Sequence, residues 1–257
     1  MSIFRTGLER FSRNIIVKRR LPKTLGRIPL IVSPGAALSY WKGDLSQHDP
    51  MLFTVVHKFV GAGQSVWDVG ANVGLFTFAA AYKVGVQGRV LAIEADIWCV
   101  TLLRRSCQLS ENRTLPVDIL PVAVANSVDI ARFHIAQRGR AANHLATVNG
   151  SSQSGGIRET QLVPCISLDW LAERYPPPDF IKIDIEAAEK VALEGATTIL
   201  SQIRPAILCE VSAGNQQAVT QILQQHGYQL YDAQDFTKGV QDQATFNTLA
   251  LPFGRSL

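Results

Sequence analysis

Short apolar runs of strand type alternate with longer stretches of helical spacing through most of this chain. Such alternation is typical of an α/β domain built around a mainly parallel sheet. Helices are expected at 49–60, 73–82, 98–109, 188–200 and 218–226. Core strands are expected at 66–69, 89–93, 117–125, 180–186, 204–211, 228–232 and 246–251. The pattern predicts an α/β fold with a mostly parallel seven-stranded sheet, helices on both faces and the last of these strands antiparallel at the edge.

Weaker patterns lie outside this alternation. Leu30-Ile31-Val32 can begin a small hairpin that turns at 33–35, and 130–135 alternates like an antiparallel strand. The polar stretch 137–156 has no periodicity, and a loop of that length is expected to be a lid or a binding loop. Disorder is the competing account for its second half, 150–156.

We divide the chain on these patterns into two parts. Residues 1–48 form a basic N-terminal arm and a lead-in, and residues 49–257 form the main domain. The lid or insertion spans about 137–160 within that domain.

The most informative stretch is a glycine-flanked turn between strand and helix, Asp68-Val69-Gly70-Ala71-Asn72-Val73-Gly74. Turns at the carboxyl end of a buried parallel strand bind nucleotide-like ligands. Asn72 stands where a dinucleotide fingerprint has its middle glycine, and the Asp68 carboxylate repels a pyrophosphate. Glu94 ends the next apolar run, where an acid can hold ribose hydroxyls. S-adenosylmethionine, an adenosine-containing cation without phosphates, satisfies these observations, whereas an NAD(P)-dependent Rossmann oxidoreductase is the disfavoured alternative.

A second informative stretch is Phe180-Ile181-Lys182-Ile183-Asp184-Ile185-Glu186. In a sheet that is covered on both faces, charges are costly unless they are paired or catalytic. Glu186 and Glu189 have a structural explanation, because acids favour the N-terminus of the helix that follows. Lys182 and Asp184 have no such explanation, which makes them candidates for a functional role.

The basic charge of the chain is concentrated at its start. Residues 1–28 hold eight basic residues and one acid, Glu9, a net charge of +7; the whole chain is +4, so residues 29–257 carry −3. Apolar residues recur at helical spacing through 1–16, so the arm can be an amphipathic helix on an anionic membrane surface. A helix that caps the domain with solvated charges is the preferred reading. Nucleic acid is not expected as a partner, because no basic patch interleaved with aromatic residues continues into the main domain.

Cysteine usage and the absence of long apolar segments indicate the cellular location to expect. Cys99, Cys107, Cys165 and Cys209 form no C-x-x-C pair, so reduced thiols are expected and a structural zinc site is not. No segment reaches the roughly 18 apolar residues of a membrane span. The first residues lack the apolar core of a secretion signal, so we expect a cytoplasmic protein, with peripheral membrane association left open through 1–28.

Four motifs in order resemble the FkbM family of S-adenosylmethionine-dependent methyltransferases. The likeness rests on the two stretches already described, on Ser167-Leu168-Asp169 and on Asn247-Thr248-Leu249-Ala250-Leu251-Pro252. It covers roughly residues 50–252, so 49–257 is expected to be the catalytic domain with a Rossmann-like class I methyltransferase fold. Two positions depart from the family: Ala187 stands where Gly is usual, and Ala95 where Pro is frequent.

The resemblance implies O-methylation of a hydroxyl on a sugar, glycolipid or secondary metabolite. The implied partner is therefore a small-molecule or glycan acceptor. A non-catalytic relative that binds a membrane or partner through its arm is a further alternative. The residues expected to bind the cofactor are Asp68, Gly70, Ala71, Asn72, Gly74, Glu94 and Ala123.

Methyl transfer to an alcohol needs alignment of the reacting atoms and removal of a proton. Asp184, at a strand tip, is the first candidate for the base, with Lys182 holding it ionised and Glu210 orienting Lys182. His144, on the expected lid, is a rival base. Asp184 and Glu210 can alternatively hold a divalent cation, but no third ligand is evident, so no metal is predicted.

Overall fold

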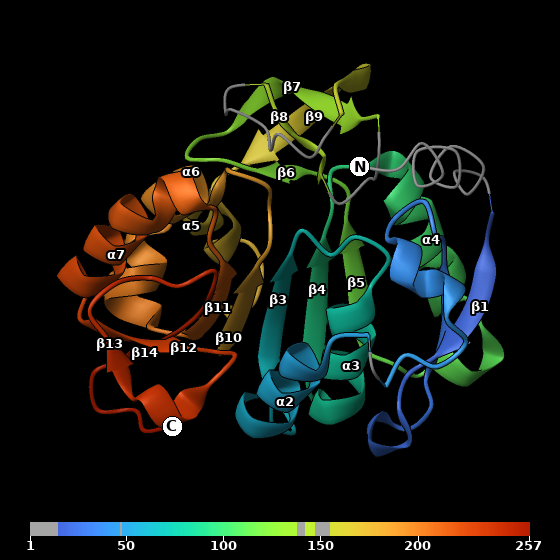
Figure 1. The fold of residues 1–257 in the computed structure, drawn as a ribbon, viewed down its shortest axis with the longest axis horizontal. Coiled ribbons are helices and arrows are strands. Elements are labelled where there is room, and N and C mark those ends of the chain that lie inside the picture. The colour runs from blue at the N-terminus through green and yellow to red at the C-terminus, as the bar shows by residue number, and fades with distance from the viewer. Residues whose placement is uncertain (1–14, 47, 138–141, 147–154) are drawn as a thin grey trace.

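A computed structural model describes residues 15–46, 48–137, 142–146 and 155–257. Its centre is an eight-stranded sheet in the order β13-β12-β14-β11-β10-β3-β4-β5 (Figure 1). Five neighbouring strands, from β11 to β5, run parallel, and β14 runs antiparallel to both of its neighbours. The strand bounds are β3 Ser65–Val69, β4 Arg89–Ile93, β5 Val117–Leu120, β10 Phe180–Ile183, β11 Ala206–Glu210, β12 Tyr228–Asp232, β13 Val240–Gln241 and β14 Asn247–Pro252.

Helices cover both faces of this sheet, as the alternating side chains of the strands require. Val66 and Val90 face one apolar cluster, which includes residues of α2, α3 and α4. Trp67 and Leu91, their sequence neighbours, face a second cluster with α5, α6 and α7. The helix bounds are α2 Pro50–Phe59, α3 Leu75–Val84, α4 Ile97–Cys107, α5 Leu168–Ala172, α6 Glu189–Glu194 and α7 Gln216–Gln225.

Two details of the predicted sheet are corrected. The closing strand β14 is antiparallel as expected, but it lies between β11 and β12 and not at the edge. The two-residue strand β13 takes that edge and brings the count to eight strands. Asn247–Pro252 is buried throughout, so its place inside the sheet agrees with its apolar composition.

The expected strand at 117–125 is divided into two strands that belong to different sheets. Pro121 separates β5 from β6, Ala123–Val124, because proline cannot donate a ladder hydrogen bond. β6 joins a four-stranded sheet of order β6-β9-β7-β8, with β7 at Asp129–Ala136, β8 at His144–Leu145 and β9 at Ile157–Ile166. This small sheet crosses the carboxyl ends of the large one (Figure 1).

The antiparallel strand expected near 130–135 is confirmed as β7. The insertion expected at 137–160 falls partly outside the described residues. Within it, β8 pairs with β7, and 157–160 belong to β9. The idea of disorder at 150–156 also lies largely outside the described residues.

The helix expected at 188–200 is interrupted at Gly195. α6 ends there, and a π-helical turn, η7 at Ile199–Ile203, follows. The Asp169 carboxylate accepts hydrogen bonds from the backbone N–H groups of Thr198 and Ile199, both at 2.9 Å, and thereby caps this second segment. The nine residues from Gly195 to Ile203 thus need their own cap.

The lead-in folds differently from its prediction. Strand β2, Pro29–Val32, pairs backward with β1, Val17–Arg20, so the turn precedes β2 and contains the 3₁₀ helix η2, Lys23–Leu25. The expected arm helix lies mostly outside the described residues, and Val17–Arg20 is a strand. The described lead-in packs on the main domain, because Leu21, Leu25 and Leu30 are buried in the same apolar cluster as residues of α3. The domain division at 48/49 stays a prediction.

Further short helices complete the described chain. They are η3 Leu38–Trp41, η4 Ser110–Asn112, η8 Ala213–Asn215 and η9 Phe236–Lys238. Asp49 caps α2 by accepting from Leu52 N–H, and Ser167 caps α5 by accepting from Trp170 N–H. No helix in the described residues is both long and apolar enough to cross a bilayer.

Candidate active site

A pocket of about 710 Å³, open to solvent, lies where the carboxyl ends of β3, β4 and β10 meet the small sheet. Of the predicted site residues, the pocket brings together Gly70, Asn72, Glu94, Ala123, His144 and Asp184. Asp68, Ala71, Gly74, Lys182 and Glu210 lie outside its lining.

The turn after β3 is built to approach the tip of β10. Gly70 has φ +79°, and a Cβ there would collide with the carbonyl oxygen of Asp184. The N–H groups of Gly70 and Ala71 both donate to Ile93 O, at 2.9 and 3.0 Å, and Asp184 N–H donates to Val69 O at 2.9 Å. These bonds join three strand tips and set Asp184 beside the turn.

Gly74 and Ala71 have no polar side chain and affect the turn only through its backbone. Gly74 has φ +94° and begins α3, and a Cβ there would meet Leu103 and Phe78. Ala71 is buried under the turn. Their contributions are therefore to backbone geometry, and their assignment as cofactor residues stays a prediction.

Glu94 lies in the pocket with both carboxylate oxygens engaged by backbone. Oε2 accepts from Asn72 N–H at 2.7 Å, and Oε1 accepts from Asp96 N–H at 2.8 Å. Burial raises the pKa of Glu94 to about 7, although these two hydrogen bonds act to lower it. Asn72 has φ +52°, and its Oδ1 accepts a weak hydrogen bond from Cys99 Sγ at 3.7 Å. Glu94 therefore ties the β3 turn to the β4 turn and keeps an acceptor for hydroxyl groups of a ligand.

Asp68 lies behind the pocket and is completely buried. Its Oδ2 accepts from Thr77 Oγ1 at 2.5 Å, and its Oδ1 is 3.6 Å from Lys182 Nζ. Burial raises the pKa of Asp68, against the attraction of Lys182. This arrangement does not favour the direct contact between Asp68 and the cofactor that the sequence predicted, because the carboxylate is completely buried and paired with Lys182.

Lys182 joins Asp68 to the pocket. Its Nζ donates to Asp184 Oδ2 at 2.8 Å. Burial alone would lower the pKa of Lys182, but Asp184 and Asp68 outweigh it and raise the pKa above its ordinary value. Lys182 is therefore a permanent cation, and it holds one oxygen of Asp184 while the other stays available in the pocket.

The ion pairs of Lys182 within the described residues are with Asp68 and Asp184, and Glu210 acts on Lys182 by charge attraction alone, so its orienting role stays a prediction. Glu210 ends β11, next to β10. Burial, and then repulsion by Asp184, raise its pKa to about 8. Glu186, for which the sequence favoured a helix-terminal role, lines the pocket instead, and burial raises its pKa to about 7.

Glu189 has a structural role. Glu189 is buried, and its oxygens accept from Ser212 Oγ at 2.6 Å and from Asn215 Nδ2 at 2.5 Å. It holds the start of α6 to the loop after β11.

The small sheet covers the pocket through β8. His144 is buried, lines the pocket and packs edge-on against His134, with 5.5 Å between ring centroids. Its neighbour Asn143 accepts from Ala136 N–H at 2.9 Å and donates to Asp96 Oδ2 at 2.9 Å. Asn143 therefore connects the cover to the same turn that Glu94 holds.

A family comparison places these features in a known group. The family described as "Methyltransferase FkbM domain" matches residues 68–230, more than half of the chain. The chain belongs to this family. The FkbM methyltransferase match begins at Asp68 in the β3 turn and ends in β12, so it contains the turn, Glu94, the small sheet and the Lys182–Asp184 pair.

Solved structures of methyltransferases are similar to the chain at low identity. Methyltransferase FkbM from Methylobacillus flagellatus KT is 17% identical over 73% of this chain, with a TM-score of 0.46, and the match spans only 43% of that protein. An S-adenosylmethionine-dependent O-methyltransferase from Thermotoga maritima is 13% identical over 89% of this chain and 74% of its own, with a TM-score of 0.44. No curated protein matches the sequence. Because these TM-scores are low, the family assignment rests on the sequence match.

Membership in the FkbM family makes the chain a methyltransferase and agrees with its Rossmann-like class I α/β architecture. It supports S-adenosylmethionine as the cofactor and gives no support to an NAD(P)-dependent oxidoreductase. The pocket fits such a group: Glu94 offers an acceptor for ribose hydroxyls, and Ala95, Cys99 and Ala123 supply apolar wall for an adenine ring.

Sequence reasoning missed Tyr40, which lies in the lead-in far from any motif. Tyr40 is 4% exposed and stacks on His48, with 4.4 Å between ring centroids. Burial raises its pKa above the ordinary value, and Cys99, Asp49 and Asp184 raise it further, so the hydroxyl is a stable donor near the strand tips. The only signal in the sequence is a Tyr and a His close together before α2, which is too common a pattern to select them.

Proposed function

We propose that this methyltransferase transfers the methyl group of S-adenosylmethionine to a hydroxyl of a sugar, glycolipid or secondary metabolite. The observation that carries the proposal is the pair of ion pairs that Lys182 makes with Asp68 and Asp184. Asp184 lines the pocket, and one of its carboxylate oxygens is bonded to Lys182. S-adenosylmethionine supplies an electrophilic methyl group and a neutral leaving group. The residues of the chain then need to align an acceptor oxygen and take its proton.

Asp184 is the base in this proposal. Lys182 donates to one carboxylate oxygen at 2.8 Å, which leaves the second oxygen for the acceptor hydroxyl. Asp68 anchors Lys182 from behind and cannot itself reach the pocket. A positioned base of this kind contributes about 10²–10⁴-fold to the rate.

The acceptor is expected to be rich in hydrogen-bond donors. Asp184, Glu186 and Glu210 gather at neighbouring strand ends, and Lys182 is the one cation that the described residues place among them. Carboxylates that are short of donors favour a ligand with several O–H or N–H groups, such as a sugar. His144 lines this region from the cover.

Cofactor binding can be tested without knowing the acceptor. In thermal shift assays on the full chain, S-adenosylmethionine and S-adenosylhomocysteine should raise the unfolding midpoint and NAD should not. Glu94→Ala should weaken binding in calorimetry roughly tenfold to a hundredfold, because it removes the acceptor for ligand hydroxyls and leaves two backbone donors unpaired. A midpoint raised by NAD alone would contradict the proposal.

The acceptor class needs a second experiment. The protein, S-adenosylmethionine with a labelled methyl group, and a fractionated cell extract should give a labelled product whose methyl sits on oxygen. Asp184→Asn serves as the negative control. A methyl group found on nitrogen or carbon would leave the enzyme a methyltransferase but overturn the O-methyl assignment.

A further inference from the structure

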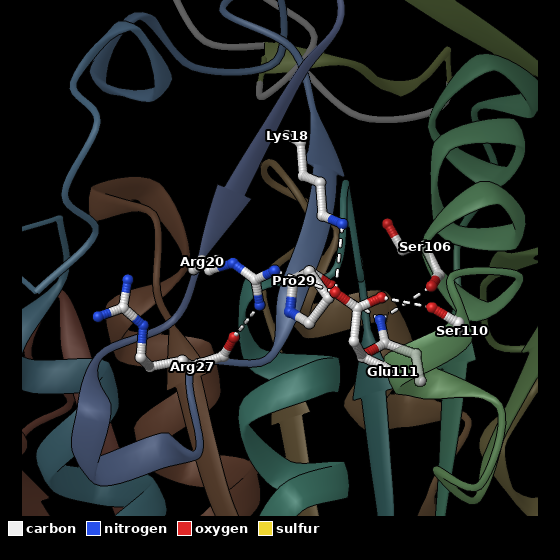
Figure 2. Close-up of polar contacts among 8 residues, drawn as sticks. Lys18, Arg20, Arg27, Pro29, Ser106, Ser110 and Glu111 are labelled. Carbon is white, nitrogen blue, oxygen red and sulfur yellow. Dashed lines mark hydrogen bonds and ion pairs between the residues drawn. The ribbon is translucent and has the colours of Figure 1, made fainter.

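The β1–β2 hairpin is fixed to α4 and η4 by buried hydrogen bonds (Figure 2). Ile31 N–H donates to Ser106 Oγ at 2.8 Å. Asn112 Nδ2 donates both to Pro29 O and to Ser106 O, each at 2.8 Å. The described part of the basic N-terminal region is therefore a rigid piece of the folded domain.

Basic side chains dominate the surface that this junction creates. Figure 2 shows Lys18 and Arg20 of β1 converging on Glu111, at 3.4 and 3.0 Å. Within 15–28 and 97–113, Glu111 is the acid that faces them. The exposed basic residues of these segments, here called the basic face, are Lys18, Arg20, Lys23, Arg27, Arg104, Arg105 and Arg113.

Two acids lie among these cations: Glu111 is shared between Lys18 and Arg20, and Asp44 is attracted by Arg27, which leaves most of the basic charge uncompensated. In the described part of the chain, Arg104, Arg105 and Arg113 make no ion pair and no side-chain hydrogen bond. Holding so many like charges on a rigid surface costs free energy through self-repulsion, which an anionic partner relieves.

An exposed tryptophan borders the basic face. Arg19 donates to the carbonyl oxygens of Tyr40, Trp41 and Lys42, at 3.0, 3.2 and 2.9 Å, and so fixes η3 beside β1. Trp41 and Ile16 are each 38% exposed. Apolar tips beside basic side chains suit the interface of a lipid bilayer, where tryptophan is favoured and anionic head groups attract arginine and lysine. Single-stranded nucleic acid instead favours several aromatic side chains along a basic groove.

We propose that the basic face binds the surface of an anionic lipid bilayer. This surface lies on the folded hairpin and α4, and does not depend on an amphipathic helix. The hairpin holds η3 beside this surface, because Arg19 donates to the carbonyl oxygen of Tyr40. The binding is peripheral and electrostatic, so salt should weaken it.

The test uses the full chain and sedimentation with two kinds of vesicle, phosphatidylcholine alone and phosphatidylcholine with phosphatidylglycerol. Wild type should bind the anionic vesicles and not the neutral ones. Arg104→Gln/Arg105→Gln should lose about fivefold in partition coefficient for each charge, roughly 25-fold in all. The matched control Arg132→Gln/Lys190→Gln removes two exposed charges elsewhere and should bind as wild type does.

Trp41→Ala should cause a smaller loss that persists at high salt. The thermal midpoint of each variant shows whether it is folded. Equal loss in the control variant, or equal binding to neutral vesicles, would overturn the proposal. So would a short RNA that binds tightly through Arg104 and Arg105 while anionic vesicles do not bind.

Discussion

The floor and the cover of the pocket are held by different kinds of bond. The floor consists of the β3, β4 and β10 tips, which backbone hydrogen bonds join directly: Asp184 N–H to Val69 O, and Gly70 N–H to Ile93 O. The cover, β8, is a two-residue strand, and the side chain of Asn143 connects it to the floor. Backbone bonds survive most substitutions, whereas a side-chain bond depends on one residue. We infer that the chemistry is fixed on the floor and that acceptor choice is set by the cover.

The largest expected effect comes from the floor. Asp184→Asn should lower kcat by about 10²–10⁴-fold and leave the dissociation constant of S-adenosylmethionine nearly unchanged, because the base is lost while Glu94 and the β3 turn remain. Steady-state kinetics and calorimetry measure the two quantities. Glu186→Gln, a change to another pocket carboxylate, is the matched control and should cost far less. If Asp184→Asn stays active and His144→Ala is inactive, the base is on the cover.

The floor should also give stability a distinctive pH dependence. Burial raises the pKa of Glu94 and Glu186 to about 7 and, with repulsion by Asp184, that of Glu210 to about 8, from 4.5. Between the ordinary pKa of 4.5 and these raised pKa values, the folded state binds more protons than the unfolded state. The contribution of these groups to the unfolding free energy therefore falls as pH rises from about 5 to 8.

Urea unfolding of wild type and Glu210→Gln at a series of pH values isolates this contribution. The lowered pKa values of His48 and His134, which burial causes, act in the opposite direction but are shared by both proteins. The variant should gain stability relative to wild type as pH rises toward 8 and above. A constant difference across the range would show that Glu210 titrates normally.

Loss of the side-chain connection between cover and floor should weaken acceptor binding and hardly change cofactor affinity. Asn143→Ala removes the bonds to Ala136 N–H and to Asp96 Oδ2, at about 1 kcal/mol each. We expect the KM of the acceptor to rise roughly fivefold to tenfold with a small change in cofactor affinity. Gln137→Ala, in the same segment, is the control. An equal loss of cofactor affinity would mean that floor and cover are one unit.

The smallest expected effect concerns a strained alanine beside the floor. Ala187 has φ +60°, which costs about 1–2 kcal/mol for a residue with a Cβ, while glycine adds about 0.4–1 kcal/mol of unfolded-state entropy. Ala187→Gly should therefore raise the unfolding free energy by about 0.5–1 kcal/mol, measurable by urea denaturation. Ala188→Gly, at negative φ, is the control and should destabilise. No gain at Ala187 would mean that its hydrogen bonds to Ser212 and Asn215 already fix the turn.

Much of the fold and part of the site could be predicted from the sequence. The run 90–93 is apolar on both faces of the sheet, and 180–183 departs from this only at Lys182, so their strand character is a local property. Glu94 and Asp184 follow such runs directly, and parallel strands bring their ends to one edge. The family's glycine at position 187 also has a local reason here, because the turn after Asp184 needs a positive φ.

Other features could not be predicted because they depend on side-chain direction or on residues far apart in sequence. Asp68 and Glu94 both stand near strand ends, but Asp68 is paired with Ala92, two positions before Glu94, and its carboxylate bonds to Thr77 of α3. Asn143 meets Asp96 across 47 residues, and Tyr40 comes near Asp184 from outside every motif. Pro121 is visible in the sequence, but its effect of moving β6 into a second sheet depends on β9 being available to pair.

The sequence by itself determined the strand–turn–helix order, the acids at the strand ends and the methyltransferase family, because periodicity and short motifs are local properties. Tertiary structure decided which acid enters the pocket, what orients Lys182 and where the basic charge lies. Those outcomes depend on which faces of distant strands and helices pack together, and a strand's two faces differ by a shift of a single residue.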